Sequence, residues 1–183
     1  VSPKSNKKIK TSELILVDSG GQYLEGTTDV TRTFIKGRAL TQQTFLYTKV
    51  LQGLICLSKL RWPAGLTGKE LDPLARHFLW EHCLDYDHGT GHGVGVFSNV
   101  HQGPQGITRV NTVPLKPGMI LSIEPGIYLE GKLGIRLENL VYIKRERGHF
   151  RQKKEFYEFE TLTLAPFEKN LIEKKLLSRD ELR

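Results

Sequence analysis

The sequence predicts an α+β fold in which helices cover one face of a mixed, mostly antiparallel sheet. Short apolar stretches with partial alternation indicate strands at residues 13–18 and 29–35. Apolar residues three and four positions apart indicate amphipathic helices at residues 41–60 and 67–83. Strand patterns dominate the remainder. With 183 residues, the chain has the length of one domain and can bury a sizeable core.

The first two predicted strands can bring two acidic residues together. Residues 13–18 read ELILVD and end on Asp18, whereas residues 29–35 read DVTRTFI and begin on Asp29. The glycine-bearing connection between them, SGGQYLEGTT, is hairpin-like. A hairpin would return Asp29 to a position beside Asp18, where the two carboxylates could share a metal ion.

The two predicted helices have recognisable ends. The first is expected to begin with Thr41 as its cap and to end before Trp62. Its buried face is expected to contain Leu46, Val50, Leu54 and Leu57. The second follows Thr67, where TGKE has the form of a capping box, and is expected to stop near Cys83.

The second half of the chain is predicted to consist mainly of strands. These are a glycine-rich segment around His92 and residues 119–124, 126–129, 134–144 and 155–164. The basic stretch from 144 to 154 is expected to form a hairpin tip. Residues 168–177 have helical spacing and predict a final helix.

The positive charge of the chain is confined to two short runs. The net charge is +7, and the bases gather at Lys4, Lys7, Lys8 and Lys10 and again at Lys144, Arg145, Arg147, Arg151, Lys153 and Lys154. Elsewhere acids slightly outnumber bases, so both runs are interpreted as solvated loops and nucleic acid is not expected as a partner.

The apolar residues indicate a protein without a membrane partner. No stretch approaches the roughly 18 consecutive apolar residues of a membrane span, and no apolar run follows the lysine-rich start as it would in a signal peptide. We therefore expect a cytoplasmic protein. Cys56 and Cys83 lack CxxC spacing and are expected to be reduced core residues.

Five potential metal ligands lie in short motifs that contain or adjoin glycine or proline. They are Asp18, Asp29, His92, Glu124 and Glu138, in VDSGG, TTDVTRTF, HGTGHGVG, SIEPGIY and GIRLENLVY. If the five converged, four carboxylates would repel one another unless cations neutralised them. An oxygen-dominated set of this size suits two adjacent ions such as manganese better than a single zinc.

The histidine-bearing segment does not fit a helix or a nucleotide-binding loop. His88 and His92 have the spacing of a zinc pair on a helix, but glycine at every second position from Gly89 to Gly95 disfavours a helix and suits an extended segment. The G-x-G-x-x-G fingerprint fails at Val96. A single histidine is usually structural, but His88, His92 and His101 together favour a site.

Glu124 and Glu138 are unusual because both are embedded in apolar sequence. Glu124 follows MILSI and precedes Pro125, where an unpaired charge would be costly. Glu138 lies within GIRLENLVYI, and strand alternation places Arg136 on the same face. Arg136 is therefore predicted to orient or partly neutralise Glu138 from outside the metal-ligand shell. A simple structural ion pair is the alternative.

These motifs together resemble those of the Xaa-Pro aminopeptidases, which belong to the creatinase, prolidase and methionine aminopeptidase group. The resemblance rests on VDSGGQYLEGTTDVTRTF, HGTGHGVG, NVHQGPQG, LSIEPGIY and GIRLENLVYI, and it covers nearly the whole chain. It implies a pita-bread fold with a curved sheet, and a two-metal enzyme that removes a residue preceding proline. The ions implied are manganese, with cobalt or zinc as alternatives.

The resemblance also assigns roles to individual residues. Asp18 would bind one ion, Asp29 and Glu138 would bridge both, and His92 with Glu124 would hold the second. His88 and His101 would be catalytic residues that line the substrate side. Glu124 would relay the proton of the water that the metals activate as a hydroxide.

One departure from the family is expected to matter. Similar enzymes carry a further histidine, more of this domain and additional domains before the lysine-rich start. We therefore expect residues 1–183 to be a partial catalytic domain, incomplete at its N-terminus, from a parent enzyme that is a homodimer. The alternatives are a prolidase acting on Xaa-Pro dipeptides, a methionine aminopeptidase and a noncatalytic pita-bread binding module.

Overall fold

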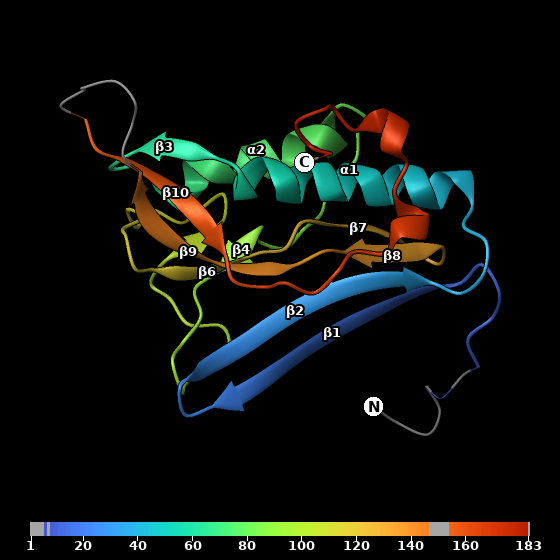
Figure 1. Cartoon of the computed structure of the whole chain (residues 1–183), viewed down its shortest axis with the longest axis horizontal. Helices are drawn as coiled ribbons and strands as arrows, with labels where there is room; N and C mark the ends of the chain where they lie inside the picture. The colour runs from blue at the N-terminus through green and yellow to red at the C-terminus, as the bar shows by residue number, and fades with distance from the viewer. Residues whose placement is uncertain (1–5, 7, 147–153, 183) are drawn as a thin grey trace.

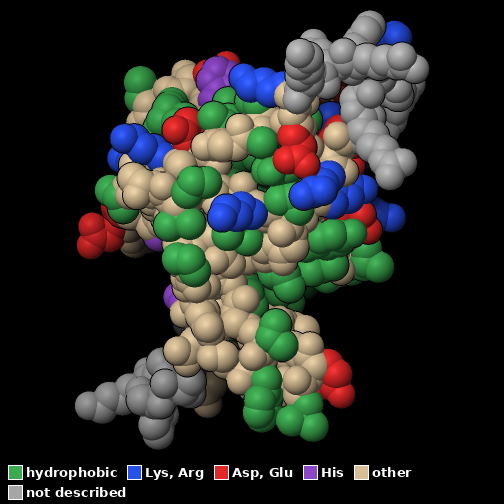
Figure 2. All heavy atoms as spheres, turned by 90° about the vertical axis from the view of Figure 1, so that its left-hand side faces the viewer, with side chains coloured by type: hydrophobic (Ala, Val, Ile, Leu, Met, Phe, Trp, Pro, Cys, Tyr) green, Lys and Arg blue, Asp and Glu red, His purple; other side chains and the backbone are tan. Residues whose placement is uncertain are grey.

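The N-terminal part of the chain is a long antiparallel hairpin. The computed structural model describes residues 6, 8–146 and 154–182. Strand β1 (Leu14–Tyr23) pairs along its whole length with β2 (Gly26–Ile35). The strands therefore continue through most of the predicted connection, and only residues 24–25 separate them. The hairpin projects from the body of the molecule, and its tip bears exposed apolar side chains, including those of Tyr23 and Leu24 (Figure 2).

Two helices cover one side of the central strands, while the hairpin lies on the other (Figure 1). Helix α1 (Thr41–Ser58) is preceded by Leu40, whose backbone N–H donates to Gln43 Oε1 over 2.8 Å, so the predicted threonine cap is wrong. Helix α2 (Gly68–Trp80) has the predicted capping box. There Thr67 Oγ1 accepts from the Lys69 N–H, and Glu70 accepts from the Thr67 N–H.

The core lies between these helices and a four-stranded sheet of order β3-β10-β9-β6. Its strands are β3 (Arg61–Pro63), β6 (Ile120–Ile123), β9 (Asn139–Glu146) and β10 (Phe156–Thr161). Two short pairs flank it, β4 (Gly91–His92) with β5 (Gly106–Ile107), and β7 (Gly126–Leu129) with β8 (Leu133–Arg136). The short strands β3 and β5 were not predicted. The four predicted core residues of α1 are all buried.

The strand predicted at residues 134–144 is interrupted at Leu137 and Glu138. The Leu137 N–H donates to the Pro125 carbonyl over 3.3 Å, and the Glu138 N–H donates to the Thr31 carbonyl over 3.1 Å. The chain therefore changes partners between β8 and β9. This change attaches Glu138 to the β1–β2 hairpin, a long-range contact that the alternation pattern does not reveal.

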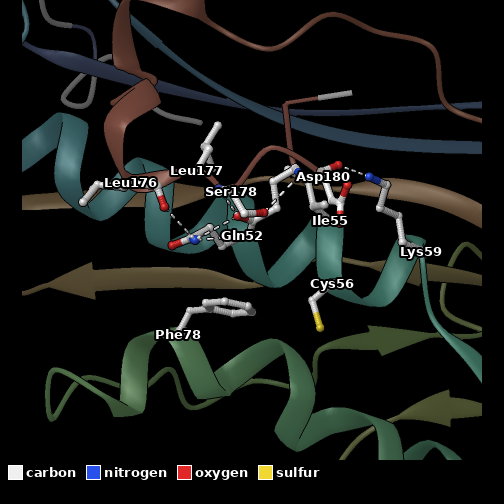
Figure 3. A pocket seen from close by; sticks show the side chains of 10 residues that line it. Gln52, Ile55, Cys56, Lys59, Phe78, Leu176, Leu177, Ser178 and Asp180 are labelled. Atoms are coloured by element: carbon white, nitrogen blue, oxygen red, sulfur yellow. Dashed lines mark hydrogen bonds between the residues drawn. The ribbon is translucent and has the colours of Figure 1, made fainter.

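The C-terminal segment is not the predicted helix. It forms two 3₁₀ turns, η2 (Lys169–Leu171) and η3 (Lys174–Leu176), because its backbone bonds to side chains of α1. The N–H groups of Glu168 and Glu173 donate to Tyr47 Oη and Thr48 Oγ1. Figure 3 shows the segment against α1, where Gln52 Nε2 donates to the Leu176 carbonyl beside a cavity of about 560 Å³.

Two smaller expectations have mixed outcomes. Cys56 is partly buried, but Cys83 is exposed and lies beyond α2, so its assignment to the core is wrong. The basic hairpin tip predicted at 144–154 lies mostly outside the described residues. Among the described residues, no helix combines the length and apolar character needed to cross a bilayer.

Candidate metal centre

The five predicted ligands converge from five separate segments of the chain. Three sets of side chains each have potential ligand atoms within 4.8 Å of one another. The sets are Asp18 with Asp29 and Glu138, His92 with Glu124 and Glu138, and Asp29 with His92 and His101. Asp29 and Glu138 each belong to two sets, and so does His92. Most of these residues line a cavity of about 360 Å³.

The hairpin supplies the two aspartates through its register. Asp18 is opposite Thr31, and Asp29 is opposite Gly20. Asp29 and Thr31 are two residues apart on β2, so their side chains share a face with Asp18. Asp29 is buried, whereas half of the Asp18 side chain is exposed. The sequence prediction that a hairpin returns Asp29 to Asp18 is therefore confirmed.

Close backbone packing explains the glycines around His92. A Cβ on Gly91 would lie 2.0 Å from the Ser122 carbonyl oxygen, and one on Gly93 would lie 2.2 Å from the Gln102 carbonyl oxygen. Any larger residue would therefore clash with a neighbouring main chain. The segment is extended, as predicted, and His92 lies at the end of the short strand β4.

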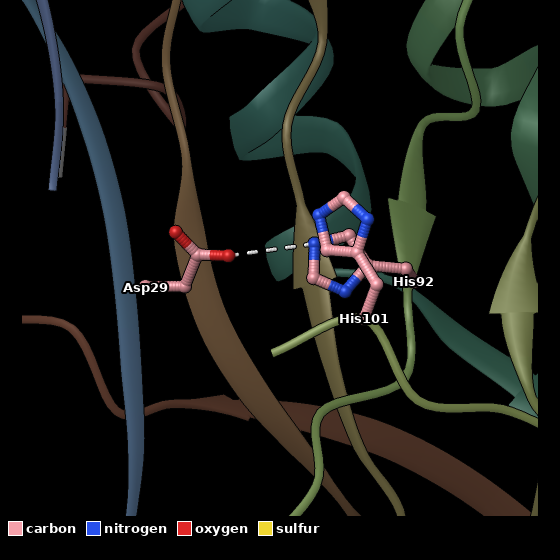
Figure 4. A group of neighbouring side chains, drawn as sticks. All are labelled: Asp29, His92 and His101. Atoms are coloured by element: carbon pink, nitrogen blue, oxygen red, sulfur yellow. Dashed lines mark ion pairs between the residues drawn. The ribbon is translucent and has the colours of Figure 1, made fainter. Parts of the chain in front are cut away.

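The imidazole of His92 presents one nitrogen to the carboxylate of Asp29 (Figure 4). Its Nδ1 lies 3.0 Å from the Gly93 carbonyl, which can only accept, so Nδ1 carries a proton. Its Nε2 lies 3.5 Å from Asp29 Oδ2 and 3.2 Å from Glu124 Oε1. Burial opposes protonation, but Asp29, the Gly93 carbonyl and Glu124 outweigh it and raise the pKa of His92.

The two glutamates occupy environments that disfavour their charged forms. Ser122 Oγ donates to Glu124 Oε1 over 2.9 Å, and Thr31 Oγ1 donates to Glu138 Oε2 over 2.7 Å. Burial raises the pKa of Glu124. Burial, together with the nearby charge of Glu124, raises the pKa of Glu138 to about 7. Without a cation, this cluster therefore holds its negative charge poorly.

The donor set fits divalent cations. Two of its buried atoms, His92 Nε2 and Glu138 Oε1, have no hydrogen-bond partner among the described residues, although buried polar atoms of this kind normally have one. Both lie within the ligand groups described above. A cation would satisfy both atoms and offset the repulsion among the carboxylates. The mixture of one or two imidazoles with several carboxylates is compatible with manganese, cobalt or zinc.

Arg136 has different partners from the one predicted. Its guanidinium forms an ion pair with Asp18, and its Nε lies 3.8 Å from Glu124 Oε2. Its Nη1 donates to Tyr128 Oη over 3.1 Å. The carboxylate of Glu138 instead accepts from Thr31. Arg136 therefore contacts predicted ligands on both sides of the site. It also reaches Glu138 indirectly, because its Nε donates to Thr31 Oγ1 over 3.2 Å and Thr31 Oγ1 donates to Glu138, although the described residues show no direct ion pair between Arg136 and Glu138.

The two further histidines occupy different places. His101 lines the metal cavity, and its ring centroid lies 3.9 Å from that of His92. Its position beside Asp29 and His92 makes it a possible ligand as well as a substrate-side residue. His88 lines a separate cavity of about 380 Å³. It reaches the site through Tyr128, whose Oη lies 2.9 Å from His88 Nε2.

Three side chains that hydrogen-bond to residues of the site were not predicted from the sequence. They are Thr31, Ser122 and Tyr128, which hydrogen-bond to Glu138, Glu124 and both Arg136 and His88, respectively. Thr31 could have been found, because it lies two residues after Asp29 on the same strand face. Tyr128 contacts residues far away in the sequence, and no local pattern indicates this.

Family comparisons agree with this arrangement. Residues 1–145 match the model of metallopeptidase family M24, and residues 155–183 match the C-terminal region of peptidase M24. The chain is 46% identical over 172 residues to Xaa-Pro aminopeptidase 1 of Dictyostelium discoideum. That match covers 92% of this chain and 27% of the relative, so the chain spans about a quarter of the relative's length.

Solved structures show the same fold. X-prolyl aminopeptidase of Caenorhabditis elegans, described as a cytosolic enzyme with a di-nuclear active site, superposes with a TM-score of 0.93 at 39% identity. The match covers 99% of this chain and 29% of that one. Xaa-Pro dipeptidase of Bacillus anthracis gives a TM-score of 0.77 at 31% identity, covering 90% of this chain and 42% of that one.

Proposed function

Because the chain belongs to metallopeptidase family M24 and has its pita-bread fold, we propose that its protein is a dinuclear metallo-aminopeptidase that removes an N-terminal residue preceding proline. The observation that carries the proposal is the convergence of five candidate ligands, two of which have a buried atom without a hydrogen-bond partner among the described residues. Similarity to Xaa-Pro aminopeptidases along 92% of this chain supports the substrate class.

The proposed ligand assignment follows the three sets of atoms. Asp18 would hold one ion, His92 and Glu124 would hold the other, and Asp29 and Glu138 would bind both. Asp29 and Glu138 each belong to two sets and, unlike His92, which also belongs to two, each has two carboxylate oxygens to offer. When bound, the ions supply Lewis acidity for the scissile carbonyl and lower the pKa of a water molecule.

The remaining chemistry falls to residues of the chain. Glu124 accepts a proton from the attacking water and passes it to the proline nitrogen as the peptide bond breaks. Burial raises the pKa of Glu124, which supports this role because a more basic carboxylate accepts a proton more readily. His101 binds the peptide beside the ions from its position on the cavity wall. His88 acts through Tyr128 at the edge of the site.

Several narrower properties are part of the same proposal. We propose manganese as the native ion, because four of the five ligands are carboxylates. A cytoplasmic location is supported by the description of the nematode enzyme as cytosolic. The partners are peptides with proline at the second position rather than nucleic acid or membranes, and the assembly is a homodimer.

A prolidase is the second candidate, because the bacterial Xaa-Pro dipeptidase shares the fold at 31% identity. The higher TM-score of 0.93 with the X-prolyl aminopeptidase favours the first candidate. A methionine aminopeptidase has less support from the motifs. A noncatalytic binding module would typically have lost metal ligands, and all five are present here.

A peptide-length series distinguishes these candidates. The full-length natural protein that carries this sequence would be stripped of metal, titrated with manganese and assayed on Xaa-Pro, Xaa-Pro-Xaa and longer peptides, with Xaa-Ala-Xaa and Met-Ala-Xaa as controls. We expect manganese-dependent release of the first residue from tripeptides and longer peptides that have proline at the second position. Cleavage of dipeptides only would establish a prolidase, and failure to bind metal would favour the binding module.

A further inference from the structure

A buried ion pair on α2 lies outside the metal centre but contacts the segment that carries His88. Asp72 and Arg76 are one helical turn apart, and their side chains are 0% and 2% exposed. Arg76 Nε donates to Asp72 Oδ2 over 2.8 Å. Two charges buried this deeply incur a large desolvation cost, which is offset only when nearly every donor and acceptor is satisfied.

The remaining donors of Arg76 bind the loop that leads to His88. Its Nη1 donates to Asp85 Oδ1 over 2.8 Å and to the Tyr86 carbonyl over 2.6 Å, and its Nη2 donates to the His88 carbonyl over 2.7 Å. The planar guanidinium thus fixes the direction of the backbone at both Tyr86 and His88. A lysine could keep the charge beside Asp72, but its single ammonium group could not reproduce this fork.

The Tyr86 ring lies between Arg76 and His88 in a series of contacts that ends at the His88 ring. The guanidinium carbon lies 3.9 Å from the centroid of the Tyr86 ring. The Tyr86 ring centroid lies 4.8 Å from that of His88, with the planes tilted by 36°. Arg76, Tyr86 and His88 therefore form a three-layer stack. Arg76 holds both the backbone and, through Tyr86, the imidazole face of His88.

This stack orients the hydrogen-bonding atoms of His88. Its Nδ1 lies 2.8 Å from the Gly89 carbonyl and so carries the proton. Burial and the charges of Arg136 and Arg76 lower the pKa of His88, although the Gly89 carbonyl opposes them, so the ring is neutral at pH 7. Its Nε2 then accepts from Tyr128 Oη, which itself accepts from Arg136.

The second oxygen of Asp72 connects the pair to the metal centre. Thr90 Oγ1 donates to Asp72 Oδ1 over 2.5 Å, and the Thr90 carbonyl accepts the N–H of Glu124 over 2.7 Å. The ion pair is thus connected on one side to His88 and on the other to the backbone of a metal ligand. An ion pair that served only to stabilise α2 would require neither connection.

We propose that Arg76 is a positioning residue that acts through His88, fixing the ring so that Nε2 meets Tyr128 at the edge of the metal centre. This inference rests on the proposed function, because it assigns Arg76 to the same peptide hydrolysis. Asp72 orients Arg76, and Tyr86 transmits its position to the imidazole. Displacement of a catalytic group by about 1 Å can lower the rate by about 10²-fold.

A double-mutant cycle in the full-length protein tests this inference. Arg76→Lys is expected to lower kcat by about 10²-fold with little change in KM and with two metal equivalents retained. In a His88→Ala background, the same substitution should have little further effect, because the residue through which Arg76 acts is gone. Arg109→Lys is the matched control. Arg109 also pairs with Asp85 and its Nε lies 4.0 Å from Asp72 Oδ2, but its side chain is largely exposed, and among the described contacts it makes no hydrogen bond to the Tyr86 or His88 backbone.

Equal losses from Arg76→Lys in the wild-type and His88→Ala backgrounds would overturn the inference and show that the ion pair is only structural. If Arg76→Lys fails to fold, Tyr86→Leu, which leaves the ion pair in place, should give the same non-additivity. Failure of both variants to fold would also count against a positioning role. An inactive wild-type protein would refute the proposed function itself, whereas additive losses in an active protein refute only the role of Arg76.

Discussion

The β1–β2 hairpin and the core-packed strands build the two sides of the metal centre in different ways. The hairpin supplies Asp18 and Asp29, but within the described part of the chain β2 is the only strand paired with β1, and half of the Asp18 side chain is exposed. His92, Glu124 and Glu138 come from segments joined to the main core. There, neighbouring backbones pack so tightly around Gly91 that no side chain fits.

This difference indicates that the two ion positions are unequally preorganised. The core side is held by hydrogen bonds from Ser122 and Thr31 and by backbone bonds at Glu124 and Glu138. On the hairpin side, Asp18 has an ion pair with Arg136 that competes with metal binding. Precise first-shell geometry requires a rigid support, so the Asp18 position is expected to bind its ion more weakly.

The largest expected effect comes from removing a ligand shared by both sides. Glu138→Gln should abolish peptide hydrolysis and weaken binding of both ions, because an amide supplies no charge to either of them. Elemental analysis after gel filtration would measure the metal retained. Glu130→Gln is a matched control, since Glu130 is exposed in the turn between β7 and β8. Two unchanged metal equivalents in Glu138→Gln would refute the bridging assignment.

A second test measures the activity of residues 1–183 expressed alone. Residues 1–183 expressed alone are expected to hydrolyse Xaa-Pro peptides at least about 10²-fold more slowly than the full-length natural protein, even with excess manganese. The reason is that the exposed strand β1 holds Asp18 loosely. Rates on one tripeptide would be compared at equal concentrations. Full specific activity of the 183 residues would show that the hairpin needs no further support.

Replacing either of the two histidines proposed to lie on the substrate side is expected to have a smaller effect, which separates turnover from metal binding. His101→Ala and His88→Ala are each expected to lower kcat by about 10²–10⁴-fold while both metal equivalents remain. His77→Ala, on the exposed face of α2, is the control. The His101 variant is the more informative of the two, because ligand atoms of His101, Asp29 and His92 lie within 4.8 Å of one another. Loss of a metal equivalent in His101→Ala would identify it as a ligand.

The smallest expected effect is a pH dependence of the metal-free protein. The folded-state pKa of Glu138 is raised from 4.5 to about 7, so the native state keeps a proton that the unfolded chain has released. Stability should therefore fall as pH rises from about 4.5 to 7. The raised pKa of His92 acts in the same direction, because stability from its protonated form is lost as pH rises.

Thermal unfolding in a chelator across pH 5–8 would measure this dependence. The unfolding temperature is expected to decrease with pH by about 2–4 °C for each kcal/mol lost. Glu138→Gln should flatten the curve, and saturating manganese should remove it. A metal-free protein whose stability rises across this range would contradict the assignment of raised pKa values to the cluster.

The hairpin and the core also differ in how well the sequence predicts them. Apolar strand patterns and a glycine-bearing connection were sufficient to predict that Asp18 and Asp29 lie close together, because a hairpin is a local structure. The break between Arg136 and Glu138 depends on hydrogen bonds to Pro125 and Thr31, which are distant in the sequence. The alternation rule therefore predicted a direct contact between Arg136 and Glu138, whereas the structure joins them through Thr31.

The same limit applies away from the centre. Residues 168–177 have helical spacing, but side chains of α1 bind their backbone and leave only 3₁₀ turns. The positions of His88 and His101 in two separate cavities also depend on tertiary packing. The five candidate ligands, which the structure brings together, could be singled out because each lies in its own compact motif. Tyr128 and Arg76 could not, because their contacts join segments that are distant in the sequence.

Calorimetric titration of manganese into the metal-free full-length protein and its Asp18→Asn variant measures whether the hairpin and the core each support one ion. We expect two binding steps of unequal affinity in the wild-type protein. In Asp18→Asn, the tighter step, assigned to the side of His92 and Glu124, should remain, and the weaker step should be lost. A single step in the wild-type protein, or two unchanged steps in the variant, would contradict a dinuclear centre divided between the hairpin and the core.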